Sequence, residues 1–262
     1  MHAVSVVRTY LKLGALNALQ YRANLLFDLI GVAGYLASFL LTLGLIFRQT
    51  DSLNGWSADE LVALVGIQIL VGGFIGLVIR PSMQLLMENI RLGSLDFMLT
   101  KPADSQLLAS VQQVNFGSIA QVAIGLAVIG TALVRLGATI GPRDALAFVV
   151  LIFCSLVIVT CFLTLLSTLS FWFVRLDNIL VIFQSAFDEA GRWPIGIYPG
   201  WLRISLTFLI PIAFAVTVPA ESLTGRLTVW AVVGTVALAA GFIVVTRWFW
   251  RVGLRRYTGA SA

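Results

Sequence analysis

ALAFVVLIFCSLVIVTCFLTLLSTLSFWFV, residues 145–174, is an apolar stretch without a single charged side chain. A helix needs about 20 mostly apolar residues to cross the hydrocarbon core of a bilayer, so this stretch is long enough for one crossing. The rest of the chain is similar, because 59% of its 262 residues are hydrophobic and only 11% are charged. Soluble domains carry roughly 25% charged residues. The sequence therefore predicts an all-α integral membrane protein.

Apolar segments before and after this stretch divide the chain further. We predict six spans, at about 25–47, 61–79, 114–136, 145–174, 178–192 and 229–250. These spans and their loops leave no room for a separate soluble domain. Residues 1–262 are therefore predicted to form a single transmembrane domain.

Prolines interrupt the apolar tract after the fifth predicted span. An interior proline removes a backbone hydrogen bond and collides with the preceding turn of a helix, and broken backbone at membrane depth must be covered by protein or by a water-filled cavity. We therefore predict re-entrant helical pieces over residues 193–226 instead of one straight span. The prolines of this tract are Pro194, Pro199, Pro211 and Pro219.

The basic residues predict the orientation of the chain. With six spans, most of the 17 Lys and Arg residues fall on the side that carries both termini, and the positive-inside rule places that side in the cytoplasm. This asymmetry accounts for the net charge of +5, so we expect the lipid bilayer, and no nucleic acid, as a partner. Residues 4–24 form an imperfect amphipathic pattern, typical of an interfacial helix in the cytoplasmic head-group layer. A simple basic overhang is the alternative.

The longest polar insert on the predicted cytoplasmic side lies between the second and third spans, with segment 88–105 at its centre. Gly93 permits a turn, Pro102 ends a short helix, and Asp104 or Ser105 caps the next one. Such a helix can dock into a groove of another protein, although an ordinary loop helix fits the composition equally well. Its expected apolar face consists of Ile90, Leu95, Met98 and Leu99.

Three motifs resemble the type-2 ABC exporter permeases. RLGSLDFMLTKP, residues 91–102, is similar to the coupling-helix region of that family. RWPIGIYPGWLR, residues 192–203, and the prolines that follow it resemble the family's outer re-entrant hairpin. QYRAN at 20–24 and TDSLNGW at 50–56 are similar to a bacterial subgroup of similar length, whose operons usually hold two different permeases and one ATPase. The resemblance covers essentially the whole chain.

The resemblance implies a function, partners and roles for particular residues. The chain would be the permease of a transporter that moves an amphiphilic or hydrophobic substrate, mostly by export, across a bacterial plasma (inner) membrane. Two ATPase subunits and a second six-span permease would be its partners, and ATP and Mg would be bound by the ATPases, with no cofactor in this chain. The coupling residues would be Arg91, Gly93, Leu95, Asp96, Met98, Leu99, Lys101 and Pro102, and the re-entrant hairpin would contain Pro194, Pro199, Trp201, Pro211 and Pro219.

The sequence also indicates what the chain is not. A phosphate-binding Walker A loop requires a Gly-Lys pair, and no such pair occurs. We therefore predict that the chain does not hydrolyse ATP and takes its energy from separate ATPase subunits. Its single histidine, His2, and its two cysteines, Cys154 and Cys161 in one apolar run, do not predict a metal site.

Three charged residues late in the fifth predicted span have two interpretations. Asp188, Glu189 and Arg192 can pair among themselves, or they can line a hydrophilic vestibule that shapes substrate choice. A stand-alone secondary transporter would need a deep coupling acid, for which the chain offers only these residues and the shallow Asp28. A membrane subunit without transport activity is the other alternative.

Overall fold

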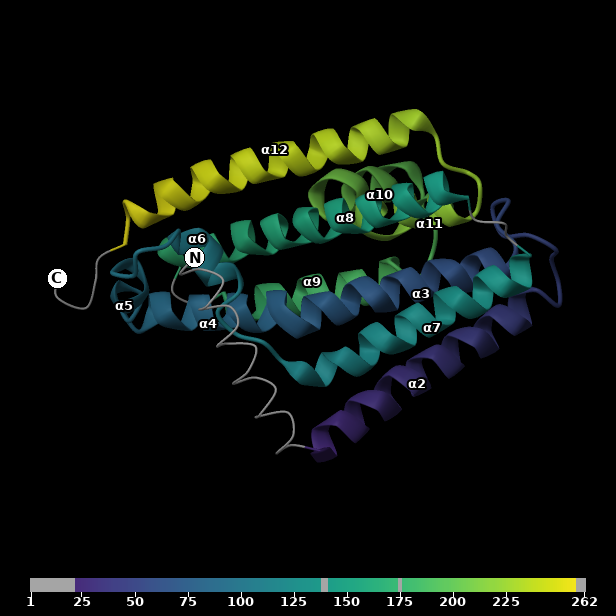
Figure 1. Cartoon of the computed structure of the whole chain (residues 1–262), viewed down its shortest axis with the longest axis horizontal. Coiled ribbons are helices and arrows are strands. Elements are labelled where there is room, and N and C mark those ends of the chain that lie inside the picture. The colour runs from purple at the N-terminus through teal and green to yellow at the C-terminus, as the bar shows by residue number, and fades with distance from the viewer. Residues whose placement is uncertain (1–21, 138–140, 174–175, 258–262) are drawn as a thin grey trace.

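The computed structural model describes residues 22–137, 141–173 and 176–257 (Figure 1). The N-terminal segment for which an interfacial helix is predicted therefore lies almost entirely outside the described residues. Regular structure in the described part is helical, and the single β-type contact is an isolated bridge between Leu53 and Trp56. The helices are α2 (Arg22–Ile46), α3 (Ala58–Phe74), α4 (Arg80–Arg91), α5 (Asp96–Leu99), α6 (Ser105–Ser110), α7 (Ile119–Leu136), α8 (Pro142–Thr168), α9 (Asp177–Ala190), α10 (Gly200–Ile204), α11 (Val218–Leu223) and α12 (Val229–Leu254).

The described part contains five helical segments that are long and apolar enough to cross a membrane. They are Leu26–Ile46, Ala58–Arg91, Phe116–Leu136, Pro142–Phe171 and Val229–Leu254. A sixth span results if the bent pair Gly200–Leu209 and Ala213–Leu223 is counted as one. The chain is thus a multi-pass membrane protein with five or six candidate spans.

Helix α9 is too short to cross a bilayer alone. It has 14 residues, which is about 21 Å at 1.5 Å per residue, whereas the hydrocarbon core is about 30 Å thick. The predicted fifth span, 178–192, therefore corresponds to a helix that does not reach full crossing length.

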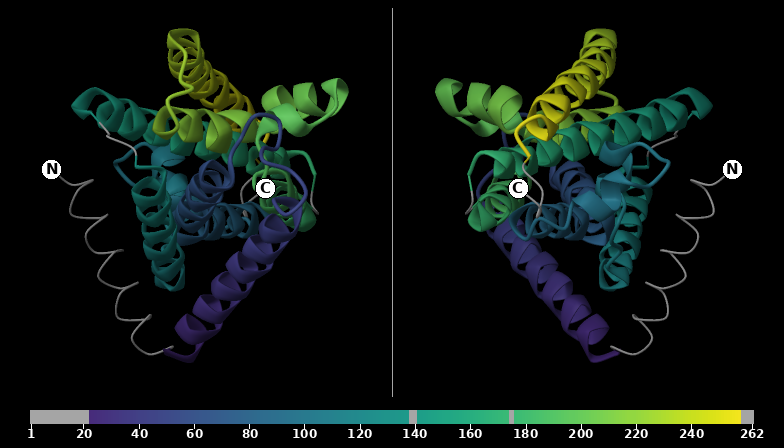
Figure 2. Two further views of the ribbon diagram at one scale, coloured as in Figure 1. Left: turned by 90° about the vertical axis from the view of Figure 1, so that its right-hand side faces the viewer. Right: turned by 90° about the vertical axis from the view of Figure 1, so that its left-hand side faces the viewer.

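The segment Ala58–Arg91 is the centre of the bundle. In its most apolar window, 72% of the residues are buried, whereas the other candidate spans have between 11% and 33% buried. Seen along the long axis of the molecule, α2 and α12 lie on opposite sides of α3 (Figure 2). The outer helices expose large apolar side chains such as Phe27, Leu41 and Phe153, as expected for surfaces that face lipid.

Glycines allow α7 to pack backbone to backbone against α3. A Cβ atom on Gly125 would lie 2.6 Å from the backbone nitrogen of Leu70, and one on Gly73 would lie 2.8 Å from that of Val122. Real Cβ atoms do not approach other atoms so closely, so both positions require glycine. Small residues at helix interfaces permit this kind of close approach in membranes.

Each π-helical turn in the described chain ends two residues before a proline. A proline has no N–H, and its ring collides with the carbonyl group four residues earlier, so the helix widens locally to accommodate the ring. Two such turns continue as helix, and at Pro211 the axis bends by 77°. The pairs are Ile75–Ile79 with Pro81, Ser205–Leu209 with Pro211, and Ala213–Thr217 with Pro219.

At each end of the bundle, polar contacts join segments that are far apart in the sequence. At one end, which we call the α6 end, α4, α5 and α6 lie beside the C-terminal end of α12 (Figure 1). There Arg247 forms an ion pair with Asp104, and the indole N–H of Trp250 donates to the hydroxyl of Ser105 at 3.1 Å. At the opposite end, Arg226 forms an ion pair with Glu60 at 2.9 Å.

Candidate functional site

The α6 end is carried on a helix that is longer than the membrane is thick. The predicted second span ends at residue 79, but the helix continues through a π-helical turn to Arg91. The 34 residues of Ala58–Arg91 are about 51 Å long at 1.5 Å per residue, against about 30 Å of hydrocarbon core. One end of this helix must therefore project beyond the core.

The turn and the cap predicted within segment 88–105 are present. Gly93 has φ of +70°, a conformation that side-chain-bearing residues rarely adopt, and the chain reverses there into α5. Helix α5 ends at Leu99, before Pro102. The side chain of Asp104 accepts the backbone N–H of Leu107 at 3.0 Å and so caps α6.

Arg247 also stabilises the charged form of this cap. Its guanidinium donates to the Asp104 carboxylate at 2.7 Å. This hydrogen bond holds the pKa of Asp104 below its usual range, because it favours the ionised carboxylate. The cap of α6 therefore stays ionised to a lower pH than that of an isolated aspartate.

The apolar face expected on the short helix is not on the surface. Leu95 is 0% exposed and Met98 is 6% exposed, and both belong to the core of the bundle. The physical reason is the tight turn at Gly93, which folds the four-residue α5 back so that this face packs inward. The exposed apolar side chains are Phe97, at 78%, and Leu92, at 62%. A surface position for Leu95 is therefore wrong, whereas Met98 is nearly buried at the wall of a groove and Leu99 is 37% exposed.

A groove of about 510 Å³ lies among α4, α5 and α6. Phe97, Met98 and Leu107 supply apolar walls, and Lys101 and Pro102 line it as well. Arg91 pairs with Glu88 at 2.8 Å on the neighbouring surface of α4. The α6 end thus combines apolar walls with charged residues around them.

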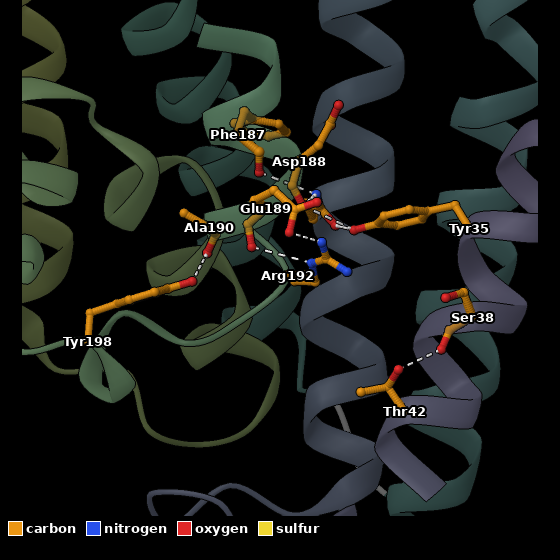
Figure 3. A network of polar contacts seen from close by, with 10 residues as sticks. Tyr35, Ser38, Thr42, Phe187, Asp188, Glu189, Ala190, Arg192 and Tyr198 are labelled. Carbon is orange, nitrogen blue, oxygen red and sulfur yellow. Dashed lines mark hydrogen bonds and ion pairs between the residues drawn. The ribbon is translucent and has the colours of Figure 1, made fainter. Parts of the chain in front are cut away.

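The charged residues late in α9 form part of a polar cluster (Figure 3). Arg192 and Glu189 form an ion pair, while the carboxylate of Asp188 accepts the side-chain N–H of Gln184 at 2.9 Å. The guanidinium of Arg192 also lies 5.8 Å from the ring centre of Tyr35. Both interpretations above describe part of this cluster, because Glu189 pairs with Arg192 while Asp188 and Glu189 both line a cavity.

This cluster caps the C-terminal end of α9. The last carbonyl groups of a helix have no partner within it. Here the carbonyl of Asp188 accepts the amide of Gln68 at 3.1 Å, that of Glu189 accepts Arg192 at 3.4 Å, and that of Ala190 accepts the hydroxyl of Tyr198 at 3.1 Å (Figure 3). Burying polar groups is tolerated when they are hydrogen-bonded, so α9 can end inside the protein.

Two adjacent cavities, of about 380 and 230 Å³, lie among α2, α3, α7 and α9. Val32 and Gln121 line both of them, and we call them together the polar cleft. Tyr35, Gln68 and Asp188 line the larger cavity. The smaller cavity is lined by the charged residues Asp28 and Arg80, the amides Gln84, Asn115 and Gln184, and Ser118, among others.

Glycines and Pro81 shape the smaller cavity. A Cβ atom on Gly76 would lie 2.6 Å from the hydroxyl oxygen of Ser118, so this glycine makes room for the polar side chain opposite. Pro81 cannot donate to the carbonyl of Leu77, and that carbonyl instead accepts the backbone N–H of Asn115 at 2.7 Å. The π-helical turn beside the cleft is therefore bonded directly to the chain that returns from α6.

A family model described as "ABC-2 family transporter protein" matches residues 33–261. The chain belongs to this family. The match covers most of the chain, from α2 onward. No curated protein and no solved structure matches the permease. Members of the family are membrane components of transporters that normally partner with an ATPase subunit and are generally not catalytic themselves.

The permease brings together residues that sequence reasoning did not connect. Gln68 and Tyr35, which are hydrogen-bonded to each other at 2.8 Å, join α3, α2 and α9. A glutamine inside an apolar span is a signal that could have drawn attention to Gln68, and likewise to Gln121. Among the described residues of the permease, no three His, Cys, Asp or Glu side chains are placed to hold a metal ion.

The predicted hairpin prolines occupy different local settings. Pro194 and Pro199 immediately precede a 3-10 turn and α10, respectively. Pro211 lies at the bend between the two short helices, and Pro219 lies inside the second of them. Trp201, on α10, is 72% exposed.

Proposed function

We propose that the chain is the permease of an ABC exporter that moves an amphiphilic or hydrophobic substrate across a bacterial plasma membrane. Two separate ATPase subunits would bind at the α6 end, which then faces the cytoplasm together with both termini. A second six-span permease, either a related chain or a second copy, would complete the pathway. Family membership supports the transport role. The proposed site of energy coupling is supported by the exposed apolar side chains at the α6 end and the charged residues around them.

Exposed apolar side chains at the α6 end favour a protein partner there. Phe97 and Leu92 are largely exposed on a part of the chain that lies beyond the apolar windows of the spans. Apolar groups surrounded by charged residues are typical of protein interaction sites. Arg91, Asp96 and Lys101 supply such charges, as the family resemblance implies for a coupling helix.

The α6 end is connected mechanically to the polar cleft. Helix α4 continues α3 through the turn Ile75–Ile79. The chain that leaves α6 is bonded to the same helix, because Ser82 and Gln113 exchange hydrogen bonds at 3.0 and 3.1 Å. A displacement of the α6 end by the ATPase would therefore move one wall of the cleft.

Substitution of Phe97 tests the coupling site. We expect Phe97→Ala to weaken the binding of the co-expressed ATPase by at least tenfold, and so to lower the amount that co-purifies with the chain, since truncating an interface anchor costs on the order of 2 kcal/mol. Phe153→Ala is the matched control, because this phenylalanine is 67% exposed on the spanning helix α8. Equal ATPase retention by both variants would refute Phe97 as a coupling contact, and no retention by the unmodified chain would refute the partnership.

A further inference from the structure

Building on the proposed transport function, we propose that the polar cleft binds the head group of a zwitterionic amphiphile, with its anionic group beside Arg80 and its ammonium group beside Asp188. The reasons lie in the depth, the charges and the lining of the cleft.

The cleft extends from the middle of the bilayer to one of its boundaries. Gln68 lies about 15 Å along the helix from Ala58, and Arg80 lies about 33 Å along it, at 1.5 Å per residue. A hydrocarbon core of about 30 Å that begins at Ala58 therefore places Gln68 near the midplane. It places Arg80 near the boundary on the side of the α6 end. A lipid-like molecule in that leaflet would have its head group at the level of Arg80.

The charged side chains that face the smaller cavity are not held in hydrogen bonds. The side chains of Arg80 and Asp28 form no hydrogen bond or ion pair within the part of the chain that the structure describes, and Arg80 attracts the Asp188 carboxylate only through space. Ionisable residues on membrane helices are costly and are commonly part of a substrate or ion pathway. Both residues are therefore available to a ligand.

The mixture of charges selects the class of ligand. Gln184 donates to the Asp188 carboxylate and also lines the cavity that contains Arg80, so it connects the negative group of one cavity with the positive group of the adjacent one. A purely anionic head would meet Asp28, Asp188 and Glu189, a purely cationic head would meet Arg80, and an uncharged apolar molecule would leave the side chains of Arg80 and Asp28 without a hydrogen-bonding partner. A head group with both charges satisfies the set.

The remaining lining suits a polar head group. The side chains of Gln84, Asn115, Ser118 and Gln121 present amide and hydroxyl groups to the smaller cavity, and such groups donate to phosphate or carboxylate oxygens. Gly76 keeps the opposite wall clear for them. Specific polar groups at a few positions fix the orientation of a ligand in this way.

Three probes with one tail test this assignment on the unmodified chain. The full-length chain, with any subunits that co-purify, is placed in phosphatidylglycerol nanodiscs without ATP, and empty nanodiscs are subtracted. Radiolabelled hexadecylphosphocholine, hexadecyltrimethylammonium and hexadecyl phosphate are then titrated. We expect hexadecylphosphocholine to bind at least tenfold more tightly than either singly charged probe. Equal binding of all three, or a preference for a singly charged probe, would overturn the proposal.

Two variants locate the binding in the cleft. Arg80→Gln should remove the preference for hexadecylphosphocholine over hexadecyltrimethylammonium, and Asp188→Asn should weaken the binding of both probes that carry a quaternary ammonium group at least fivefold. Arg203→Gln and Asp51→Asn are matched controls, since these exposed residues lie outside the cleft. If the cleft variants bind all probes as the controls do, the assignment is wrong.

Two further features of the design separate the possible outcomes. Adding phosphatidylethanolamine to the nanodiscs competes with the probe if the natural ligand is a bilayer lipid, and does not compete if it is a single-tailed amphiphile; either result supports the head-group class. Binding is measured without hydrolysis, so a loss of ATPase association would leave this measurement unaffected. A failure of the head-group assignment can therefore be distinguished from a failure of the proposed transport complex.

Discussion

Leu95 illustrates how a single residue within the α6 end can have a structural role. Its neighbours in sequence include charged residues, and a four-residue helix has too few positions for a reliable apolar periodicity. The inward direction of its side chain follows from the reversal at Gly93, which directs α5 back onto the core. Leu92, three residues earlier, lies before that reversal and is exposed.

The two leucines should therefore differ in their effect on stability. We expect Leu95→Ala to lower the free energy of unfolding by about 2–5 kcal/mol, because it leaves a cavity in the core, whereas Leu92→Ala should change it by less than about 0.5 kcal/mol. Thermal unfolding of the purified full-length chain in one detergent measures the difference. Similar melting temperatures for the two variants would contradict the buried position of Leu95.

At the scale of single residues, the sequence predicts the contacts that form between near neighbours in the chain. The turn at Gly93 and the cap by Asp104 depend on nearest neighbours in sequence, so the sequence predicts them. The partners of Asp188 could not be predicted in this way, because Gln68 and Tyr35 are brought to it by the packing of three helices. Side-chain partners far apart in the sequence require the tertiary arrangement.

At the scale of elements, the bounds of each apolar stretch in the sequence predict where most of the spanning helices begin and end. Helices α2, α7, α8 and α12 lie within a few residues of the stretches at 25–47, 114–136, 145–174 and 229–250. Hydropathy cannot predict the extension of α3 through Pro81 to Arg91, since proline favours a break and the flanking residues become polar. The π-helical turn resolves this conflict, because it accommodates the ring without ending the helix.

The bond between this turn and the returning chain can be tested by hydrogen exchange. Pro81→Ala supplies an N–H that competes for the carbonyl of Leu77, so we expect the amide of Asn115 to exchange about two- to tenfold faster, as the loss of one hydrogen bond of about 0.5–1.5 kcal/mol implies. Pro219→Ala follows another π-helical turn and should leave Asn115 unchanged. Unaltered exchange at Asn115 in Pro81→Ala would show that the turn does not depend on the proline.

At the scale of the whole molecule, the tract 193–226 occupies the part of the bundle that the short helix α9 does not reach. Helix α9 ends beside Gln68, about halfway along the span of α3. Beyond it, a Cβ atom on Gly196 would lie 2.4 Å from the side-chain nitrogen of Asn54, in the loop before α3. Arg226, at the other end of the tract, pairs with Glu60. Both ends of the tract therefore lie at the end of the bundle opposite α6.

The middle of the tract reaches deeper into the bundle. The carbonyl of Phe214 accepts the hydroxyl of Ser155 at 2.8 Å, and Ser155 lies about 20 Å from the start of α8 at 1.5 Å per residue. Because the chain enters and leaves at one end and bends by 77° in between, a re-entrant hairpin explains these contacts better than a complete span.

Cysteine labelling in intact cells distinguishes these two paths. In a variant without Cys154 and Cys161, we expect Gly200→Cys and Thr224→Cys to react with an impermeant maleimide added outside, since both flank the hairpin at the outer end. Leu209→Cys, which is exposed on the hairpin by 69%, should resist labelling from either side because lipid covers it. A complete span would place Gly200 and Thr224 on opposite sides of the membrane, so labelling of one from outside and of the other only from the cytoplasm would exclude the hairpin.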